Sequence, residues 1–382
     1  MTPGRAETLA CAPFSGSYAP ADCEFLLKPI RLAPTPVALK ERMIQGATRH
    51  YSEMLAPESL PPPAYLALFR ALTQAHAERL GREILSLAAY IARTRVAPLT
   101  VVSLARAGTP IGALLTRALG ARLGIAARHY SISIIRDRGI DTNALRYLLR
   151  VAARPAAGLV FVDGWTAKGV ITQELKAAVA RWNRTEPEHL DDRLYVLCDL
   201  GGAADVAAGY DDYAIPSGIL NATVSGLVSR SVLNHQLGAG DFHGCVFYDQ
   251  FAAADHSTWF LDQIAATFDA AKIQEITLEA RAARGRQTRE WLHACMGRNG
   301  IADQNLIKPG VAEATRVLLR RVPERLLLRD PGDAEVRHLI ELAETRGVPI
   351  SVEPTMPLRA AAIIHSHGDA TGRTASARSN EP

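Results

Sequence analysis

Short apolar segments alternate with helix-like segments in the middle of the chain, and this alternation restricts the fold more than any other feature. Four segments rich in Val, Ile and Leu are bounded by turn residues: 99–104, 129–135, 158–162 and 193–198. The intervening segments 110–124 and 143–153 have the apolar spacing of helices. Such a pattern predicts an α/β fold, a parallel sheet with helices on both faces, in which ligands bind at the carboxyl ends of the strands.

The chain length of 382 residues predicts two domains, since a domain averages roughly 150 residues. The first is predicted over 1–300, with a Pro-, Ser- and Ala-rich wrap over 1–36, helices over 37–55 and 64–95, and a charged helical bridge over 256–300. The second, a small α/β unit, is predicted over 301–366. It contains helices over 311–320 and 334–346 and strands over 325–328 and 349–352. The polar tail 367–382 is predicted to be disordered.

Charge and cysteine content exclude several classes of protein. Lys and Arg number 43 and Asp and Glu 39, so the net charge of +4 is too small for the whole chain to act as a polycation. The five cysteines are far apart and form no C-x-x-C pair, which predicts free thiols in a reducing compartment. No apolar segment approaches the ~20 residues of a membrane span, and no secretory leader is visible. A cytoplasmic protein without a membrane partner is expected, and its oligomeric state stays open.

The segment 159–172 carries the sharpest motif, an apolar strand that ends in Asp163 and passes through a small-residue loop into a helix. Backbone N–H groups at such a helix start bind phosphate, and Thr166 and Lys168 add a hydroxyl and a cation. Asp163 can accept hydrogen bonds from two sugar hydroxyls. The Walker pattern G-x-x-x-x-G-K-[ST] is absent. These residues predict a ribose-phosphate pocket, although Asp163 could instead be a helix cap and Lys168 a solvated cation.

The motif resembles that of the type I phosphoribosyltransferases, and the turn 103–109 resembles the pyrophosphate loop of that family. Gly164 stands where the family has a second acid, and Ala167-Lys168-Gly169 replaces its Gly-Thr pair. Six segments together carry a resemblance that covers nearly the whole chain: 14–18, 25–29, 50–54, 103–110, 162–166 and 216–221. They are similar to phosphoribosyltransferase-like proteins with a C-terminal Pelota-type domain, found in tellurite-resistance and stress operons and often named cysteine protease StiP.

The resemblance implies transfer of a phosphoribosyl group from phosphoribosyl pyrophosphate, with Mg²⁺ as cofactor, to an unknown nucleobase-like acceptor. Four residues are expected to be catalytic: Asp163, Arg106, Arg136 and Arg138. The segment 136–141 is similar to the mobile lid of the family, or it is a solvated turn. Residues expected to bind substrate are Ser103, Ala107, Gly108, Thr109, Asp141, Gly164, Thr166, Ala167, Lys168, Gly169, Ser217 and Asn221. Ser217 and Asn221 could equally be turn formers.

A basic segment in the second domain suggests contact with nucleic acid. Between residues 316 and 329 the charge is 5 − 1 = +4. The order of elements resembles the Pelota and L7Ae RNA-binding fold, which implies structured RNA as a partner. The expected RNA contacts are Lys308, Gly310, Glu313, Arg316 and Arg320. Ala312 occupies the position of the family's asparagine, which favours recognition of RNA shape over sequence. The alternative is that the arginines only solvate a helix face.

Two other functions remain open from the sequence. A degenerate pocket would make the protein a nucleotide sensor that also binds RNA. A cysteine peptidase needs a thiolate beside a histidine, and His243 and Cys245 would share a face if they lie on a strand. No known peptidase signature surrounds Cys245, and a small buried cysteine is the structural alternative. The His and Cys spacing matches no zinc pattern, so no metal site built from side chains of that kind is expected.

Overall fold

The computed structural model describes residues 12–320 and 322–364, and the chain folds into two compact units. The first unit runs to Asp211 and resumes over Ile215–Arg286; the second consists of Asp212–Ala214 and the chain from Gln287 onward. The predicted tail 367–382 lies outside the described residues. None of the described helices combines the length and apolarity needed to cross a membrane.

The first unit is built on a largely parallel sheet, as predicted. Its strands lie in the order β1 (Glu24–Leu26), β4 (Ala127–Ile135), β3 (Leu99–Ala105), β6 (Leu159–Thr166), β7 (Leu194–Asp199) and β8 (Val206–Gly209). The short strand β5 (Gly139–Ile140) is antiparallel to β4. All four strands expected from the apolar segments are present. The N-terminal segment does more than wrap around the sheet, because Phe25 and Leu26 of β1 are completely buried.

The chain reverses its direction of travel across the sheet between β3 and β6. From β3 it moves to the neighbouring β4 on one side, and from β6 it moves to β7 on the other. Because right-handed crossovers in opposite directions lie on opposite faces, the loops after β3 and β6 diverge and leave a ligand-binding position between them. This position is the topological switch point of the sheet.

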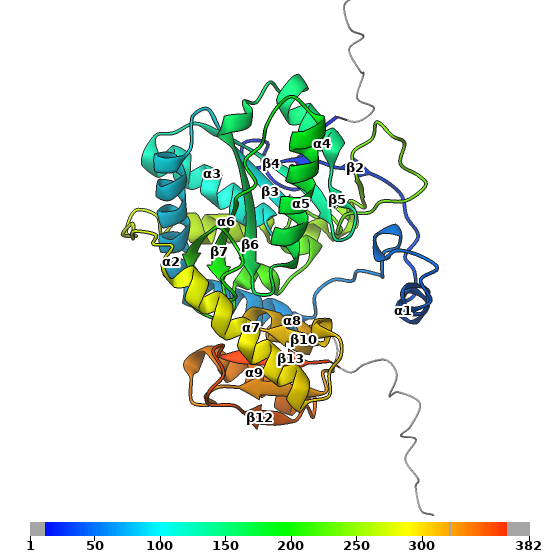
Figure 1. Cartoon of the computed structure of the whole chain (residues 1–382), viewed down its shortest axis with the longest axis vertical. Helices are drawn as coiled ribbons and strands as arrows, with labels where there is room; N and C mark the ends of the chain where they lie inside the picture. The colour runs from blue at the N-terminus through cyan, green and yellow to red at the C-terminus, as the bar shows by residue number, and fades with distance from the viewer. Residues whose placement is uncertain (1–11, 321, 365–382) are drawn as a thin grey trace, which may run out of the picture. The chain divides into compact units, whose positions relative to one another are not determined.

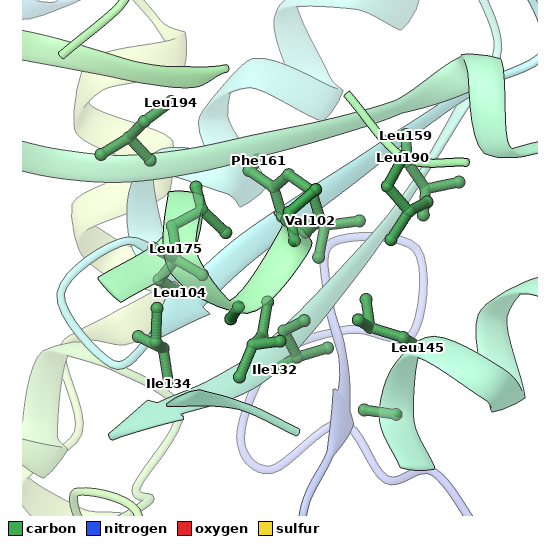
Figure 2. Close-up of a cluster of buried hydrophobic side chains, with 14 of the residues drawn as sticks. Val102, Leu104, Ile132, Ile134, Leu145, Leu159, Phe161, Leu175, Leu190 and Leu194 are labelled. Atoms are coloured by element: carbon green, nitrogen blue, oxygen red, sulfur yellow. The ribbon is translucent and has the colours of Figure 1, made fainter. Parts of the chain in front are cut away.

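Helices cover both faces of the sheet (Figure 1). One face is covered by α4 (Thr142–Arg146) and α5 (Val170–Thr185), and Figure 2 shows the resulting apolar cluster, in which Leu175 of α5 lies among Leu104, Ile134 and Phe161 of the strands. On the other side, α3 (Thr109–Leu123) packs on β3 and β4 and contacts α2 (Pro63–Thr94) and α6 (Ser257–Ala265). Side chains of successive strand residues therefore face different helices, which is the alternation expected of a sheet buried on both sides.

Several predicted helices are shorter than expected. The first, α1, covers Val37–Gln45 and ends before Gly46, and a separate 3₁₀ turn forms at Tyr51–Glu53. The helix predicted over 143–153 consists of α4 followed by a π turn at Tyr147–Val151. The expected bridge 256–300 is not one helix, since α6 ends at Ala265 and α7 covers Ala280–Arg298.

The second unit contains a four-stranded mixed sheet in the order β10 (Ile307–Pro309), β13 (Ala360–Ile363), β11 (Arg325–Leu328) and β12 (Ile350–Val352). Its helices are α8 (Val311–Arg320) and α9 (Arg337–Thr345). The unit begins earlier than the predicted residue 301, because Trp291 and Cys295 of α7 are buried in it and Nε1 of Trp291 donates to Glu353 at 3.2 Å.

Candidate functional site

The loop after β3 lies directly against the end of β6. A Cβ atom on Gly108 would lie 2.8 Å from the carbonyl oxygen of Val162 and 3.0 Å from Cα of Asp163. A Cβ atom on Gly164 would lie 3.3 Å from the carbonyl oxygen of Ala107. Glycine is therefore required at position 108, because a side chain there would collide with the backbone of β6. Two of the predicted substrate-binding segments, the loop after β3 and the end of β6, are thus in direct contact at the switch point.

Asp163 lies within β6 and not after it, which differs from the predicted strand end at 162. The strand continues to Thr166 because Asp163, Trp165 and Thr166 pair with Val196, Cys198 and Asp199 of β7. The side chain of Asp163 is half-buried, and its Oδ1 accepts a hydrogen bond from the N–H of Gly164 at 2.8 Å. The carboxylate thus belongs to the sheet, one strand away from the loop after β3.

A tight turn over 167–169 joins β6 to α5. Gly169 has φ +75° and is the N-cap of α5, so this position needs a residue that tolerates the left-handed region. The loop after β7 packs on this turn, since a Cβ atom on Gly201 would lie 1.6 Å from the carbonyl oxygen of Ala167. In the first turn of α5, Thr172 is 3% exposed, and its Oγ1 has no hydrogen-bond partner among the described residues.

Arg106 is held by three acceptors from distant segments. Its Nη1 donates to both carboxylate oxygens of Glu58, at 3.1 and 3.0 Å, and to the carbonyl of Val228 at 3.2 Å. Its Nη2 donates to Oδ1 of Asn221 at 3.0 Å. The structure therefore brings together Arg106 and Asn221, which were both predicted, and adds Glu58. Sequence reasoning missed Glu58 because it lies in an irregular Pro-rich segment without a recognisable motif.

The loop that contains Ser217 approaches β6 through Trp165. A Cβ atom on Gly218 would lie 2.8 Å from the Trp165 ring, so the indole lies over this glycine. Ser217 is 8% exposed, and its Oγ has no hydrogen-bond partner within the described residues. A buried hydroxyl without a partner carries a free-energy cost that a bound polar group would remove.

The predicted lid divides into an exposed tip and a buried end. Arg136 and Arg138 are exposed on the β4–β5 hairpin, and Nη2 of Arg138 donates to Glu53 at 3.0 Å. Asp141, in contrast, is 1% exposed and caps α4 by accepting from the N–H groups of Asn143 and Ala144. Burial raises the pKa of this carboxyl. Asp141 therefore has a structural role in place of the substrate contact expected from the sequence.

Two other predicted substrate ligands point into the protein interior. The hydroxyl of Ser103 bonds to Nε2 of His129 at 2.7 Å, and the hydroxyl of Thr109 bonds to that of Ser131 at 2.7 Å. Ser103 and Thr109 are both 0% exposed. Ser103 lies in β3 and Thr109 is the first residue of α3, and both hydroxyls bond to side chains of β4. The expectation that these hydroxyls bind substrate is therefore corrected.

The described cysteines are all buried. Cys23, Cys198, Cys245 and Cys295 are at most 4% exposed, and burial raises the pKa of the Cys23 and Cys295 thiols. Nδ1 of His243 is 2.8 Å from the hydroxyl of Ser133, and burial lowers the pKa of this histidine. A thiol of this kind is not accessible to a peptide substrate.

In the second unit, three of the predicted RNA contacts lie on one face of α8. Glu313, Arg316 and Arg320 are the positions of α8 that are not buried, and Arg316 pairs with Glu313 at 2.9 Å. Their spacing of three and four residues places them on the same side of the helix. Gly310, with φ +94°, makes the turn between β10 and α8, and Lys308 lies in β10.

The chain resembles known proteins over nearly its whole length. Residues 16–265 match the family model described as tellurite-like stress resistance cysteine protease StiP, and residues 286–366 match the PELOTA RNA binding domain. The cysteine protease StiP of Acinetobacter baylyi is 38% identical over an alignment of 369 positions, which covers 93% of this chain and 95% of that protein.

Similar solved structures are phosphoribosyltransferases. The hypoxanthine phosphoribosyltransferase of Trypanosoma cruzi is 16% identical, with 36% of this chain and 77% of that chain covered and a TM-score of 0.25. The HGPRT-ase from Leishmania tarentolae in complex with GMP is 20% identical, with 35% and 70% covered and a TM-score of 0.22. By its family match and its relative, the chain belongs to the StiP family and carries a C-terminal PELOTA domain.

Proposed function

We propose that the first unit is a phosphoribosyltransferase that uses phosphoribosyl pyrophosphate and a nucleobase-like acceptor. The observation that carries the proposal is the contact between the loop 106–108 and the end of β6 at the switch point. Sheets of this type bind their ligands there, between loops that diverge to opposite faces. The name of the Acinetobacter baylyi relative describes a different activity, that of a cysteine protease.

Each part of the donor has a matching group in the chain. Asp163 would accept hydrogen bonds from the ribose hydroxyls. The N–H groups at the start of α5, with Thr166 and the unsatisfied hydroxyl of Thr172, would bind the 5-phosphate. Arg106 and the amides around Gly108 would bind the pyrophosphate. Ser217, whose buried hydroxyl needs a partner, would read a polar edge of the acceptor.

The chain's donor set fits a magnesium ion that enters with the substrate. Gly164 leaves Asp163 as the single acid of the motif, and within residues 12–320 and 322–364 no group of three His, Cys, Asp or Glu side chains could hold a metal by itself. Mg²⁺ is commonly held by one or two carboxylates together with substrate phosphates. When bound, Mg²⁺ would neutralise part of the charge on the pyrophosphate.

The reaction would break the bond between ribose C1 and a pyrophosphate oxygen and form a bond from C1 to the acceptor nitrogen, whose proton would pass to the leaving pyrophosphate or to water. Negative charge then grows on the leaving pyrophosphate, and the fixed guanidinium of Arg106 would stabilise it without reorganisation. Arg136 and Arg138, exposed on the hairpin tip, would add positive charge and reduce the access of water. The three arginines would act mainly in the transition state, in which the ribose carries positive charge and the departing pyrophosphate carries negative charge.

Calorimetric titration with phosphoribosyl pyrophosphate and Mg²⁺ tests this proposal. We expect the wild type to bind and Asp163→Asn to bind at least tenfold more weakly. The control is Asp269→Asn, because the carboxylate of Asp269 is 98% exposed and contacts only Arg122 among the groups described. Absence of binding by the wild type would overturn the proposal. Binding without release of pyrophosphate, across a panel of bases, would instead assign a nucleotide sensor.

A second function, RNA binding, is proposed for the second unit. The observation that favours it is the single exposed face of α8 with Glu313, Arg316 and Arg320, inside the segment that matches the PELOTA domain. Two arginines on one helix face supply a positively charged surface for phosphates. The burial of the four described cysteines does not favour the peptidase activity in the relative's name.

A further inference from the structure

Arg230 is a partly buried arginine, and one nitrogen of its guanidinium has no hydrogen-bond partner in the described part of the chain. Its Nη2 donates to the carbonyl oxygen of Tyr51 at 2.7 Å and to that of Met54. Its Nη1 is buried and has no hydrogen-bond partner among the described residues. No described carboxylate forms an ion pair with this guanidinium. Burying a guanidinium under these conditions is costly, and burial lowers its pKa.

Other arginines lie around the same residues. The guanidinium carbon of Arg230 is 5.3 Å from the centre of the Tyr51 ring, and that of Arg136 is 5.5 Å from the same ring. The charges of Arg106 and Glu58 act on Arg230 in opposite directions, since Arg106 lowers the pKa of Arg230 and Glu58 raises it. Tyr51 therefore contacts both Arg136 of the hairpin tip and Arg230.

A count of charges shows one unit of positive charge in excess. Arg106 pairs with Glu58, Arg138 with Glu53, and Arg136 with Asp137 at 3.4 Å. Arg230 has no such partner within the described part of the chain, so the balance of this cluster is 4 − 3 = +1. Arg136 and Arg138 are exposed, so the unpaired charge that burial makes costly is that of Arg230, and a bound anion would compensate it.

We infer that Arg230 is an anion-binding residue whose Nη1 donates to an oxygen of the pyrophosphate group, beside Arg106. The inference rests on the proposed function, and it names a residue that no motif in the sequence indicated. Pyrophosphate suits the position because its several oxygens can be shared by two guanidinium groups, and because its complex with Mg²⁺ keeps a net negative charge.

A purely structural role is the alternative, in which Arg230 only holds the carbonyl groups of Tyr51 and Met54. The two roles use different nitrogens, Nη1 for the anion and Nη2 for the carbonyls. A structural role predicts a change in stability alone. The inferred role predicts a change in anion affinity that remains when the folded fraction is matched.

Calorimetric titration with inorganic pyrophosphate and Mg²⁺ tests the inference on the full chain. We expect Arg230→Gln to bind at least tenfold more weakly than the wild type. Arg150→Gln removes the same charge from an exposed arginine paired with Glu186 and Glu188, and we expect its affinity to stay within twofold. If Arg230→Gln does not fold, Arg230→Lys serves in its place, with an expected three- to tenfold loss because lysine lacks the planar fork.

Two results would overturn the inference: no pyrophosphate binding by the wild type, or equal affinity in the wild type and the folded Arg230 variant. Its failure is distinguishable from that of the proposed function. If pyrophosphate binds through Arg230 but phosphoribosyl pyrophosphate is neither bound nor used, the proposed function is overturned and the anion site is supported. If donor use is normal and the Arg230 variant binds pyrophosphate unchanged, only the inference falls.

Discussion

Nη2 of Arg106 donates to Oδ1 of Asn221 at 3.0 Å and so joins the loop after β3 to a turn 115 residues later in the chain. Glu58 strengthens this junction, because its Oε1 accepts from Arg106 and also from the N–H of Ala222 at 2.7 Å. Three segments that are remote in sequence are thereby fixed at the carboxyl end of β3.

Arg106→Lys should weaken this junction although it keeps the charge. A lysine cannot reach Glu58 and Asn221 at once, so at least one charged hydrogen bond is lost, at about 1.5–3 kcal/mol. Urea unfolding should show that loss, and the titration with phosphoribosyl pyrophosphate should show weaker binding. Arg184→Lys, which changes an exposed arginine of α5, is the control and should change neither. Equal stability of Arg106→Lys and the wild type would contradict the role given to the guanidinium fork.

The buried cysteines should be unreactive in the folded protein. In a Cys11→Ser variant, which removes the cysteine outside the described residues, an aromatic disulfide reagent should label no thiol under native conditions and four in denaturant. Cys245→Ala should reduce stability by roughly 1 kcal/mol, as for loss of a small buried group. Rapid native labelling of Cys245, or peptide cleavage that disappears in Cys245→Ala, would restore the peptidase hypothesis.

Acid should destabilise the first unit through His129. Burial lowers the pKa of His129 from 6.5 to about 4, and its Nδ1 donates to the carbonyl of Asp22 while Nε2 accepts from Ser103. Because the folded pKa is depressed, this contribution is present above pH 6.5 and is lost as the pH falls toward 4, by roughly 3 kcal/mol in total. His129→Gln should therefore show a weaker decline in amide protection of β4 over this range.

His76 provides a second, independent acid dependence that should remain in the His129 variant. Burial lowers its pKa to about 4 as well. Identical pH profiles for His129→Gln and the wild type would show that the pKa of His129 does not differ between the folded and unfolded states.

Asp212 should give the second unit the opposite response. Burial raises the pKa of this carboxyl from 3.8 to about 6, despite its bonds from the N–H groups of Val311 and Arg359. Its contribution is present below pH 3.8 and is lost as the pH rises through 6, by roughly 3 kcal/mol. Amide exchange of β11 and β13, compared at each pH with Asp212→Asn, measures the difference. A wild type that gains no protection, relative to the variant, between pH 7 and 4 would contradict this sign.

Arg316→Gln and Arg320→Gln should each weaken RNA binding and reduce the slope of log affinity against log salt by about one. Arg337→Gln is the matched control, because it removes an equal charge from the exposed side of α9. Binding to a structured RNA, measured by fluorescence anisotropy over a salt series, checks the prediction. Equal losses in all three variants would indicate general charge attraction in place of a defined face.

The order of strands and helices was predictable because it depends on local patterns. The runs ending at Leu104, Ile135 and Val162 have the composition of buried parallel strands, and the structure confirms them. The short edge strands β1 and β8 were not predicted, because a few residues bounded by irregular chain carry no measurable period. The division of α7 between the units depends on the burial of Trp291, which is a tertiary property.

Candidate site residues were predictable only where the backbone itself carries the motif. Gly108 and Gly169 mark positions at which the chain is close to a neighbour or has positive φ, and the sequence indicated both loops. Whether a polar side chain faces the interior depends on the element that carries it and on what packs against it. This is why Ser103 in β3, Thr109 at the start of α3 and Asp141 at the N-cap of α4 were misassigned. Glu58 and Arg230 could not be found, since their partners are distant in sequence and their surroundings show no pattern.

The second unit is not a continuous piece of chain, because it includes Asp212–Ala214. Asp212 leaves the ribosome 99 residues before Val311 and 147 residues before Arg359, to which it is bonded in the finished protein. During synthesis, Asp212 therefore lacks these hydrogen-bond donors until the residues that carry them have been added. A fragment that ends at Arg286 lacks Val311 and Arg359, so the Asp212 carboxylate would have neither of these hydrogen-bond donors. We expect local unfolding of such a fragment to begin in the segment before Ile215.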